Sequence, residues 1–149
     1  MEPIELRFTV ACSPEHAFEV WATRTSLWWP HSHSRSGDPG LTVTIEPRPG
    51  GRIYERTPAG VEHDWGEVLA WEPPGRLAHL GGVLTMPVDV PEVDIRFAAS
   101  GDATTTVTIV HRGWEQLGAR AHDLRRRNRQ NWDGLLPHYQ RACAGTLSD

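Results

Sequence analysis

The chain opens with a regular alternation of apolar and polar residues. In "IELRFTV", residues 4–10, the first residue and every second residue after it are apolar, and the residues between them are Glu5, Arg7 and Thr9. A period of two places the apolar side chains on one face, so this segment predicts a strand with one buried face. The next segment, "SPEHAFEVWA", changes to a helical pattern, in which Ser13 is suited to cap the helix and Pro14 to begin it.

A brief second helix and an irregular loop are expected in "SLWWPHSHSRSGDPG", which is rich in Gly, Pro and Ser after its two tryptophans. Short runs rich in β-forming residues come next, separated by "PGG", "PAG", "PPG", "SGDA" and a proline-bearing loop. These runs are "LTVTIEP", "GRIYERTP", "EHDWGEVLAWEPP", "RLAHLGG", "PEVDIRFAA" and "TTTVTIVHRG". Strands in series without a helix between them predict hairpins and an antiparallel sheet.

A helical period appears in the last quarter of the chain. From Glu115 onward, steps of three and four residues place one set of side chains on a single helix face. The set is Leu117, Ala121, Leu124, Asn128, Trp132, Leu135 and Tyr139. Pro137 interrupts the pattern, because a proline removes one helical hydrogen bond and clashes with the preceding turn. We therefore expect one long C-terminal helix with a kink or break near Asp133–Pro137.

These elements predict an α+β protein of the helix-grip type. A curved antiparallel sheet of about seven strands would wrap around the long C-terminal helix, with two short helices after the first strand. The chain shows no repeat and no linker, so residues 1–149 are expected to form a single domain. Gly50 and Gly51 are followed by a strand pattern rather than by a helix, which favours a hairpin turn over a phosphate-binding loop.

Charge and composition narrow the function classes. The net charge is −4, which argues against a nucleic-acid binder. The N-terminal segment does not resemble a signal peptide, and no apolar run approaches the roughly 18 residues of a membrane span. A cytoplasmic protein is therefore expected. The spacing of Cys12 and Cys143 suggests neither a zinc site nor a redox motif, so both are interpreted as packed free thiols.

Four motifs in order resemble the SRPBCC superfamily with its START-like helix-grip fold. They are "WWPHSHS", "EPRPGGRIYER", "DWGEVLAWEPPGRL" and "TTTVTIVHRGWEQLG". The branch that this chain resembles comprises bacterial relatives of the activator of the ninety-kilodalton heat-shock chaperone's ATPase. The resemblance extends from Ile4 to about Tyr139 and implies an apolar cavity between the sheet and the last helix. Two departures lie beside that cavity: Asn131–Trp132 replaces the family's Gly-Trp, and Pro137 falls where the family's helix continues.

Three polar residues fall on faces that would otherwise be apolar. His111 shares a strand face with Val107 and Ile109, and Asn128 lies within the apolar stripe of the last helix. Each could face the cavity or make a structural hydrogen bond. Glu55 would point inward if Ile53 does, and an unpaired buried carboxylate would have a raised pKa suited to proton transfer. The alternative is that Tyr54 faces inward and Glu55 is solvated.

Seven of the 149 residues are tryptophan, a side chain that is large to bury and costly to expose. These rings either fill the core or form an aromatic wall around a flat ligand. The candidates for lining such a cavity are Trp29, Trp65, Trp71, Trp132 and Phe97. A binding pocket of this kind would ordinarily exceed roughly 300 Å³.

Two other clusters carry less weight. His31 and His33, with His63 or Asp64, fit no metal-binding spacing, so we expect no metal and no cofactor. The run Arg125–Arg129 would fan out around a helix and is interpreted as a solvated outer face rather than a nucleic-acid patch.

The leading hypothesis is a domain that binds a small apolar or aromatic molecule between the sheet and the last helix. The second is an enzyme of the cyclase, aromatase or hydratase-like kind, with Glu55 and His111 as acid and base. The third is a partner protein of a chaperone ATPase, ranked lowest because 149 residues leave no room for the eukaryotic activator's further binding domain. A homodimer is left open, and no catalytic residue is assigned.

Overall fold

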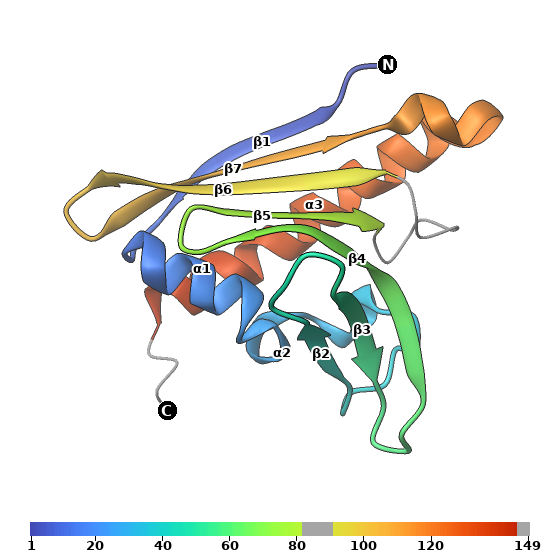
Figure 1. Ribbon diagram of the computed structural model, residues 1–149, viewed down its shortest axis with the longest axis horizontal. Helices are drawn as coiled ribbons and strands as arrows, with labels where there is room; N and C mark the ends of the chain where they lie inside the picture. Colours follow the sequence, from blue (N-terminus) through green and yellow to red (C-terminus); the bar gives the residue numbers. More distant parts are fainter. Residues whose placement is uncertain (82–90, 146–149) are drawn as a thin grey trace.

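The computed structural model of the chain describes residues 1–81 and 91–145 (Figure 1). The expected proline-bearing loop that follows Gly82 lies outside these residues. The first half contains β1 (Ile4–Val10), α1 (Pro14–Ala22), α2 (Thr25–Trp28), the 3-10 helix η1 (His31–His33), β2 (Thr42–Ile45) and β3 (Arg52–Arg56). The second half contains β4 (Glu62–Glu72), β5 (Arg76–Gly81), β6 (Glu92–Gly101), β7 (Thr104–Arg112), the 3-10 helix η2 (Trp114–Arg120) and α3 (Ala121–Ala144).

The seven strands form one sheet in the order β1-β7-β6-β5-β4-β3-β2. Every neighbouring pair is antiparallel, which confirms the predicted sheet. The long strand β4 bends away from the flatter part of the sheet and carries β3 and β2 with it (Figure 1). At Gly66 in β4, a Cβ atom would overlap the carbonyl of Leu80 on the neighbouring strand. A glycine at this position lets β4 and β5 approach closely while the sheet curls.

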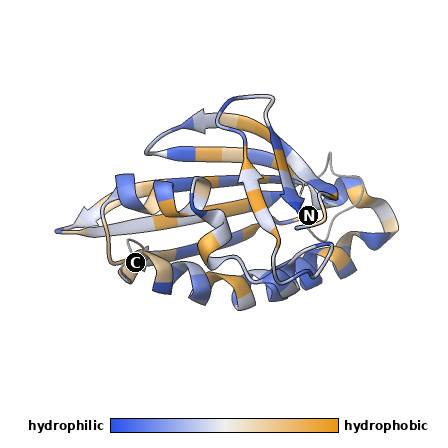
Figure 2. Ribbon diagram, turned by 90° about the horizontal axis from the view of Figure 1, so that it is seen from below, coloured by the Kyte–Doolittle hydropathy of each residue, from blue (hydrophilic) through white to orange (hydrophobic). Residues whose placement is uncertain are grey.

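Helix α3 runs under the sheet and presents alternating apolar and polar bands (Figure 2). Its buried residues include all the members of the predicted face from Ala121 to Tyr139. The helix-grip α+β fold predicted from the sequence is therefore confirmed. No helix in the described part of the chain has the length and apolar character needed to cross a membrane.

The expected break at Pro137 is wrong, because α3 continues through this residue to Ala144. Pro137 lies on the exposed side of the helix. The hydrogen bond that it cannot donate would have gone to the carbonyl of Asp133, which is also on the exposed side and can be hydrated instead. Proline is tolerated on this face, since the core side of the helix is not disturbed.

The last helix also begins later than predicted. The segment Trp114–Arg120 is a 3-10 helix, and its Gly118 takes φ 62° and ψ −132°, which are not helical angles. Glycine adopts this conformation without the steric penalty of a side chain, so it separates η2 from α3. The start of α1 agrees with the prediction: Ser13 Oγ accepts a hydrogen bond of 3.2 Å from the amide of His16.

The two cysteines lie far apart in sequence, but the fold brings them together. Cys12 and Cys143 are both free and buried, and their thiols are within hydrogen-bonding contact. Burial raises the pKa of the Cys12 thiol, against a smaller opposite effect of its contact with Cys143. Burial likewise raises the pKa of Cys143 to about 12. Both groups are therefore protonated thiols near neutral pH.

A thiol-reactivity assay should show this protection. Because the thiolate is the reactive form and both side chains are buried, we expect the native protein to react with Ellman's reagent at least about 100-fold more slowly than free cysteine. In guanidinium chloride both thiols should react at once. Rapid modification of one thiol in the native protein would contradict the packing described here.

Candidate functional site

A pocket lies between the concave face of the sheet and helix α3. Strands β2 to β7 contribute Val43, Ile45, Ile53, Trp65, His79, Gly81, Val93 and His111, and the helical side contributes Trp21, Thr25, Trp29, Asn128, Asn131, Trp132 and Leu135. No Asp, Glu, Lys or Arg is among these described lining residues. The cavity volume is about 60 Å³, which corresponds to about four to six water molecules at roughly 10–15 Å³ each. It is smaller than the expected pocket of roughly 300 Å³.

Aromatic rings form a continuous arc around this pocket. The ring centroids of Trp65 and Trp29 are 5.0 Å apart, and those of Trp29 and Trp28 are 5.3 Å apart. Trp21 continues the arc at 5.1 Å from Trp28 and at 6.1 Å from Trp132. Such tilted contacts add to the stabilisation from burial. The wall of the pocket is therefore a set of mutually packed, well-positioned rings.

Four of the five indole N–H groups of this arc are bonded within the protein. Trp28 donates to the carbonyl of Val20, and Trp29 donates to the carbonyl of His33. Trp65 donates to Glu55 Oε1 at 2.8 Å, and Trp132 donates to Nδ1 of His111 at 3.0 Å. Because these donors are already paired, the three of these rings that line the pocket, Trp29, Trp65 and Trp132, present mainly apolar surface to anything in it.

His111 is buried at the end of β7 and lines the pocket, with 2% of its surface exposed. The ring of Trp114 lies against it, with centroids 4.5 Å apart, and the Trp114 indole donates to the His111 carbonyl at 2.8 Å. Nδ1 accepts from Trp132, whereas the buried Nε2 has no hydrogen-bond partner among the described residues. Burial, with a smaller repulsion from His79, lowers the pKa of His111 to about 3. The imidazole is thus neutral at physiological pH.

His79 is a pocket residue that the sequence reasoning missed. Its Nδ1 lies 3.2 Å from the carbonyl of Leu80, and a carbonyl can only accept, so Nδ1 carries the proton. Burial lowers the pKa of His79 to about 4. The alternation within "RLAHLGG" places His79 on the same strand face as Leu77 and Gly81, and this signal could have identified it.

Asn128 has both of the roles that the sequence left open: it makes a structural hydrogen bond and it faces the cavity. Its Nδ2 donates to the carbonyl of Leu124 one turn earlier, at 2.8 Å. The side chain is buried and also lines the pocket. Asn131, at the departure from the family's Gly-Trp pair, lines the pocket beside Trp132.

Glu55 points inward but does not line the pocket. It is fully buried, and its carboxylate accepts from the amide of Arg35 at 2.6 Å and from the amide of Ser36 at 3.0 Å, in addition to the Trp65 indole. Burial by itself raises the pKa of Glu55, but the hydrogen bonds outweigh it and hold the pKa below its ordinary value. The sequence suggested a raised pKa only if the carboxylate of Glu55 were unpaired. Because it is paired, Glu55 is an ionised side chain that connects the loop after η1 to β3.

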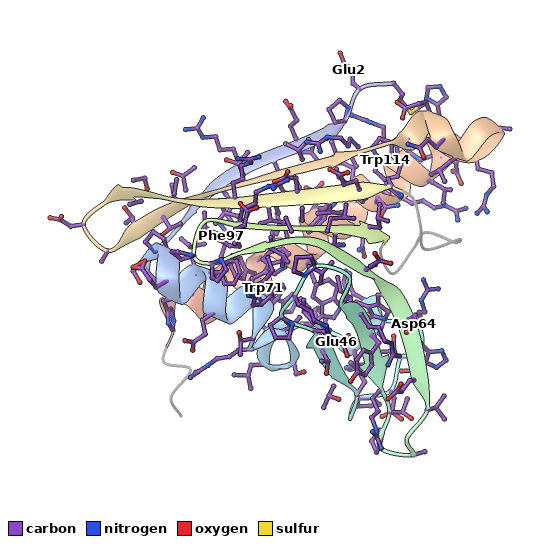
Figure 3. The ribbon with its side chains drawn as sticks, viewed as in Figure 1. Glu2, Glu46, Asp64, Trp71, Phe97 and Trp114 are labelled. Atoms are coloured by element: carbon purple, nitrogen blue, oxygen red, sulfur yellow. The ribbon has the colours of Figure 1, made fainter. Side chains whose placement is uncertain are left out.

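Phe97 is inward and buried, but it packs elsewhere in the core. Its ring centroid lies 5.4 Å from that of Phe18, which in turn is 5.1 Å from Trp71. Figure 3 shows Phe97 and Trp71 beside α1, whereas Trp114 lies toward the other end of the sheet. The structure therefore gathers five of the seven predicted site residues around one pocket: Trp29, Trp65, His111, Asn128 and Trp132. Glu55 and Phe97 are outside it.

The other candidate clusters have structural partners. Asp64 accepts from Arg52 at 2.7 Å, and within residues 1–81 and 91–145 no three His, Cys, Asp or Glu side chains form a group that could hold a metal. Arg125 donates to the carbonyls of Glu2 and Pro3, which fastens the N-terminal segment to α3. The remaining arginines of the run pair with acidic residues of the same helix.

Comparison with known proteins identifies relatives of this fold. Residues 11–138 match the family described as Activator of Hsp90 ATPase homolog 1-like protein. This match agrees with the resemblance indicated by the four sequence motifs. No curated protein matches the chain.

Solved structures give the same result for the fold. Txn09, described as an anthrahydroquino-gamma-pyrone synthase, is 33% identical, with a TM-score of 0.58 over 83% of this chain and 84% of its own. The self-sacrificing resistance protein CalC from Micromonospora echinospora is 24% identical, with a TM-score of 0.70 over 95% and 94% of the two chains. The Aha1 protein from Colwellia psychrerythraea, solved as a dimer, is 17% identical, with a TM-score of 0.66 over 96% of each chain.

Proposed function

The chain belongs to the family of Activator of Hsp90 ATPase homolog 1-like proteins, and on this premise we propose that it binds a small apolar or aromatic molecule between the sheet and α3. The observation that carries the proposal is the arc of tryptophans around a pocket with no charged side chain among its described lining residues. Aromatic walls with few polar groups are typical of small-molecule sites.

The size of the pocket limits the ligand. A volume of about 60 Å³ is smaller than the roughly 150 Å³ of a cavity that holds benzene, so even a ligand with one aromatic ring requires side chains of the pocket to move. A ligand with several rings would require larger movements at the pocket mouth. The name of the 33% identical relative, a synthase of an anthrahydroquino-gamma-pyrone, supports a ligand with aromatic rings.

The name of this relative also favours an enzyme as the second candidate. The proposed Glu55–His111 acid–base pair gains no support, because Glu55 lies outside the pocket and is held by three hydrogen-bond donors. With a pKa of about 3, His111 is a weak base near neutral pH. An enzymatic reaction in this pocket would therefore rely mainly on binding and orientation.

Neither a chaperone partner nor a homodimer gains comparable support. The large exposed apolar side chains of the described residues are Met1, Leu27, Val61 and Leu69, and they come from three parts of the chain, since Val61 directly precedes β4 and Leu69 lies within it. The dimer is a property named for the Colwellia protein, whose likeness shows the fold. Both states remain proposals, and analytical ultracentrifugation of this protein would test the dimer.

Ligand-observed NMR with two single-ring probes, acetophenone and α-methylstyrene, tests the binding function. We expect at least one probe to bind with a dissociation constant on the order of 1 mM, since a ligand of about nine heavy atoms rarely achieves more. Asn131→Phe should fill the pocket mouth and weaken binding at least about tenfold. The matched control is Gln130→Phe, which places the same ring on the exposed side of α3. No binding of either probe, or equal weakening by both variants, would contradict the proposal.

A further inference from the structure

The Nε2 atom of His111, which has no hydrogen-bond partner among the described residues, indicates what kind of ligand the pocket can bind. Nδ1 accepts the indole proton of Trp132 at 3.0 Å, and an accepting nitrogen carries no proton. In a neutral imidazole the proton must then be on Nε2. His111 is therefore held in one tautomer, with its N–H group on the nitrogen that lacks a partner among the described residues.

The orientation of this N–H group is fixed from both sides. Trp132 holds Nδ1, while the ring of Trp114 lies against the imidazole and its indole binds the His111 carbonyl. With 2% of its surface exposed, His111 has little freedom to turn away. A buried donor without an acceptor destabilises the protein, so such a group is expected to meet a water molecule or a ligand atom.

Resting on the binding function proposed above, we propose that His111 donates a hydrogen bond from Nε2 to the carbonyl oxygen of a neutral aromatic ligand. An aromatic ketone or a related ring carbonyl fits this requirement, because it joins a flat apolar body to a single strong acceptor. Of the tryptophans that line the pocket, Trp29, Trp65 and Trp132 already donate their indole N–H groups to protein acceptors. His111 thus orients the polar end of the ligand.

The charge of the pocket favours a neutral ligand over an acid. The described lining residues include no Lys or Arg, and the two titratable groups among them, His111 and His79, both have pKa values well below neutrality. A buried carboxylate would have no cationic partner there, and burying an unpaired charge is strongly unfavourable. A carbonyl oxygen accepts the same hydrogen bond without this cost.

Comparison of acetophenone with α-methylstyrene tests the proposal, because the two differ mainly in the replacement of C=O by C=CH₂. We expect the wild-type protein to bind the ketone about tenfold more tightly, since the hydrocarbon leaves the buried donor unpaired. His111→Phe by itself would leave the Trp132 indole without its acceptor, so the test variant combines His111→Phe with Trp132→Phe, and in this double variant the preference should disappear. Equal binding of the two probes by the wild type would overturn the role of His111 and leave the binding function intact. Binding of neither probe would overturn both.

Two measurements on the wild-type protein remain decisive if the double variant does not fold. Long-range ¹H–¹⁵N spectra of histidine-labelled protein should show His111 as the neutral tautomer protonated at Nε2. The carbonyl ¹³C resonance of bound, labelled acetophenone should shift from its position in hexane toward its position in a hydrogen-bonding solvent. Protonation at Nδ1, or a bound carbonyl resonance equal to that in hexane, would overturn the proposal. A ketone preference that persists in the double variant would do the same.

Discussion

Replacement of Tyr139 by alanine is expected to lower the free energy of unfolding by about 3–5 kcal/mol, the range for truncating a large buried aromatic side chain. Tyr139 is fully buried on α3. Its ring packs against Trp21 at 4.8 Å and against Trp28 at 5.1 Å, and its hydroxyl donates to the carbonyl of Ala17 at 2.7 Å. The side chain therefore joins α3 to both short helices, and its loss leaves a cavity at their junction.

The control is Tyr139→Phe, which keeps the ring and removes only the hydroxyl. It should cost about 1–2 kcal/mol, because the carbonyl of Ala17 loses one buried hydrogen bond. Urea unfolding followed by circular dichroism measures both variants. Equal losses in the two variants would show that the hydrogen bond, rather than ring packing, holds α3 against α1. A loss below about 1 kcal/mol in Tyr139→Ala would contradict the packing itself.

Replacement of Glu55 by alanine is expected to cost about 2–4 kcal/mol, because it leaves two backbone amides and one buried indole without their acceptor. The amides belong to Arg35 and Ser36, and the indole belongs to Trp65. Trp65 also forms part of the pocket wall, so the variant should bind the aromatic probes more weakly. Chemical denaturation measures the stability, and Glu67→Ala, at an exposed position of β4, is the control expected to stay within about 0.5 kcal/mol of wild type.

The same carboxylate predicts a dependence on pH. Since the pKa of Glu55 is lower in the folded protein than its ordinary value of 4.5, its contribution is complete above that value. The contribution is lost as pH falls through the folded pKa. The stability difference between wild type and Glu55→Gln should therefore be largest near pH 7 and shrink below about pH 4.5. A difference that does not change with pH would contradict an ionised Glu55.

The two pocket histidines act over a wider pH range, which overlaps the range of Glu55 below about pH 4.5. Their folded pKa values of about 3 and about 4 lie below the ordinary value of 6.5, so the unfolded chain binds protons first as pH falls. They therefore stabilise the fold above about pH 6.5, and this stabilisation declines from there toward their folded pKa values. The effect is common to wild type and Glu55→Gln, so the difference between these two proteins isolates Glu55.

The sequence by itself determined the elements and the faces of the strands. Alternation in β1 and β7, turn residues between the runs and the helical period after Ala121 each depend on neighbours within a few positions, so they can be read along the chain. The same alternation placed Val107, Ile109 and His111 on one buried face. It also allowed an inward Glu55, although it could not exclude Tyr54.

Only the tertiary structure decided what the inward side chains meet. Phe97 and His111 both face inward, but Phe97 packs against Phe18 near α1, whereas His111 meets Trp132 of α3 in the pocket. Glu55 is paired with the loop at Arg35, 20 residues earlier in the chain. Such partners are set by how distant segments come together, and no local pattern encodes them. The orientation of one imidazole, and with it the proposed ligand chemistry, therefore depends on contacts that only the folded chain creates.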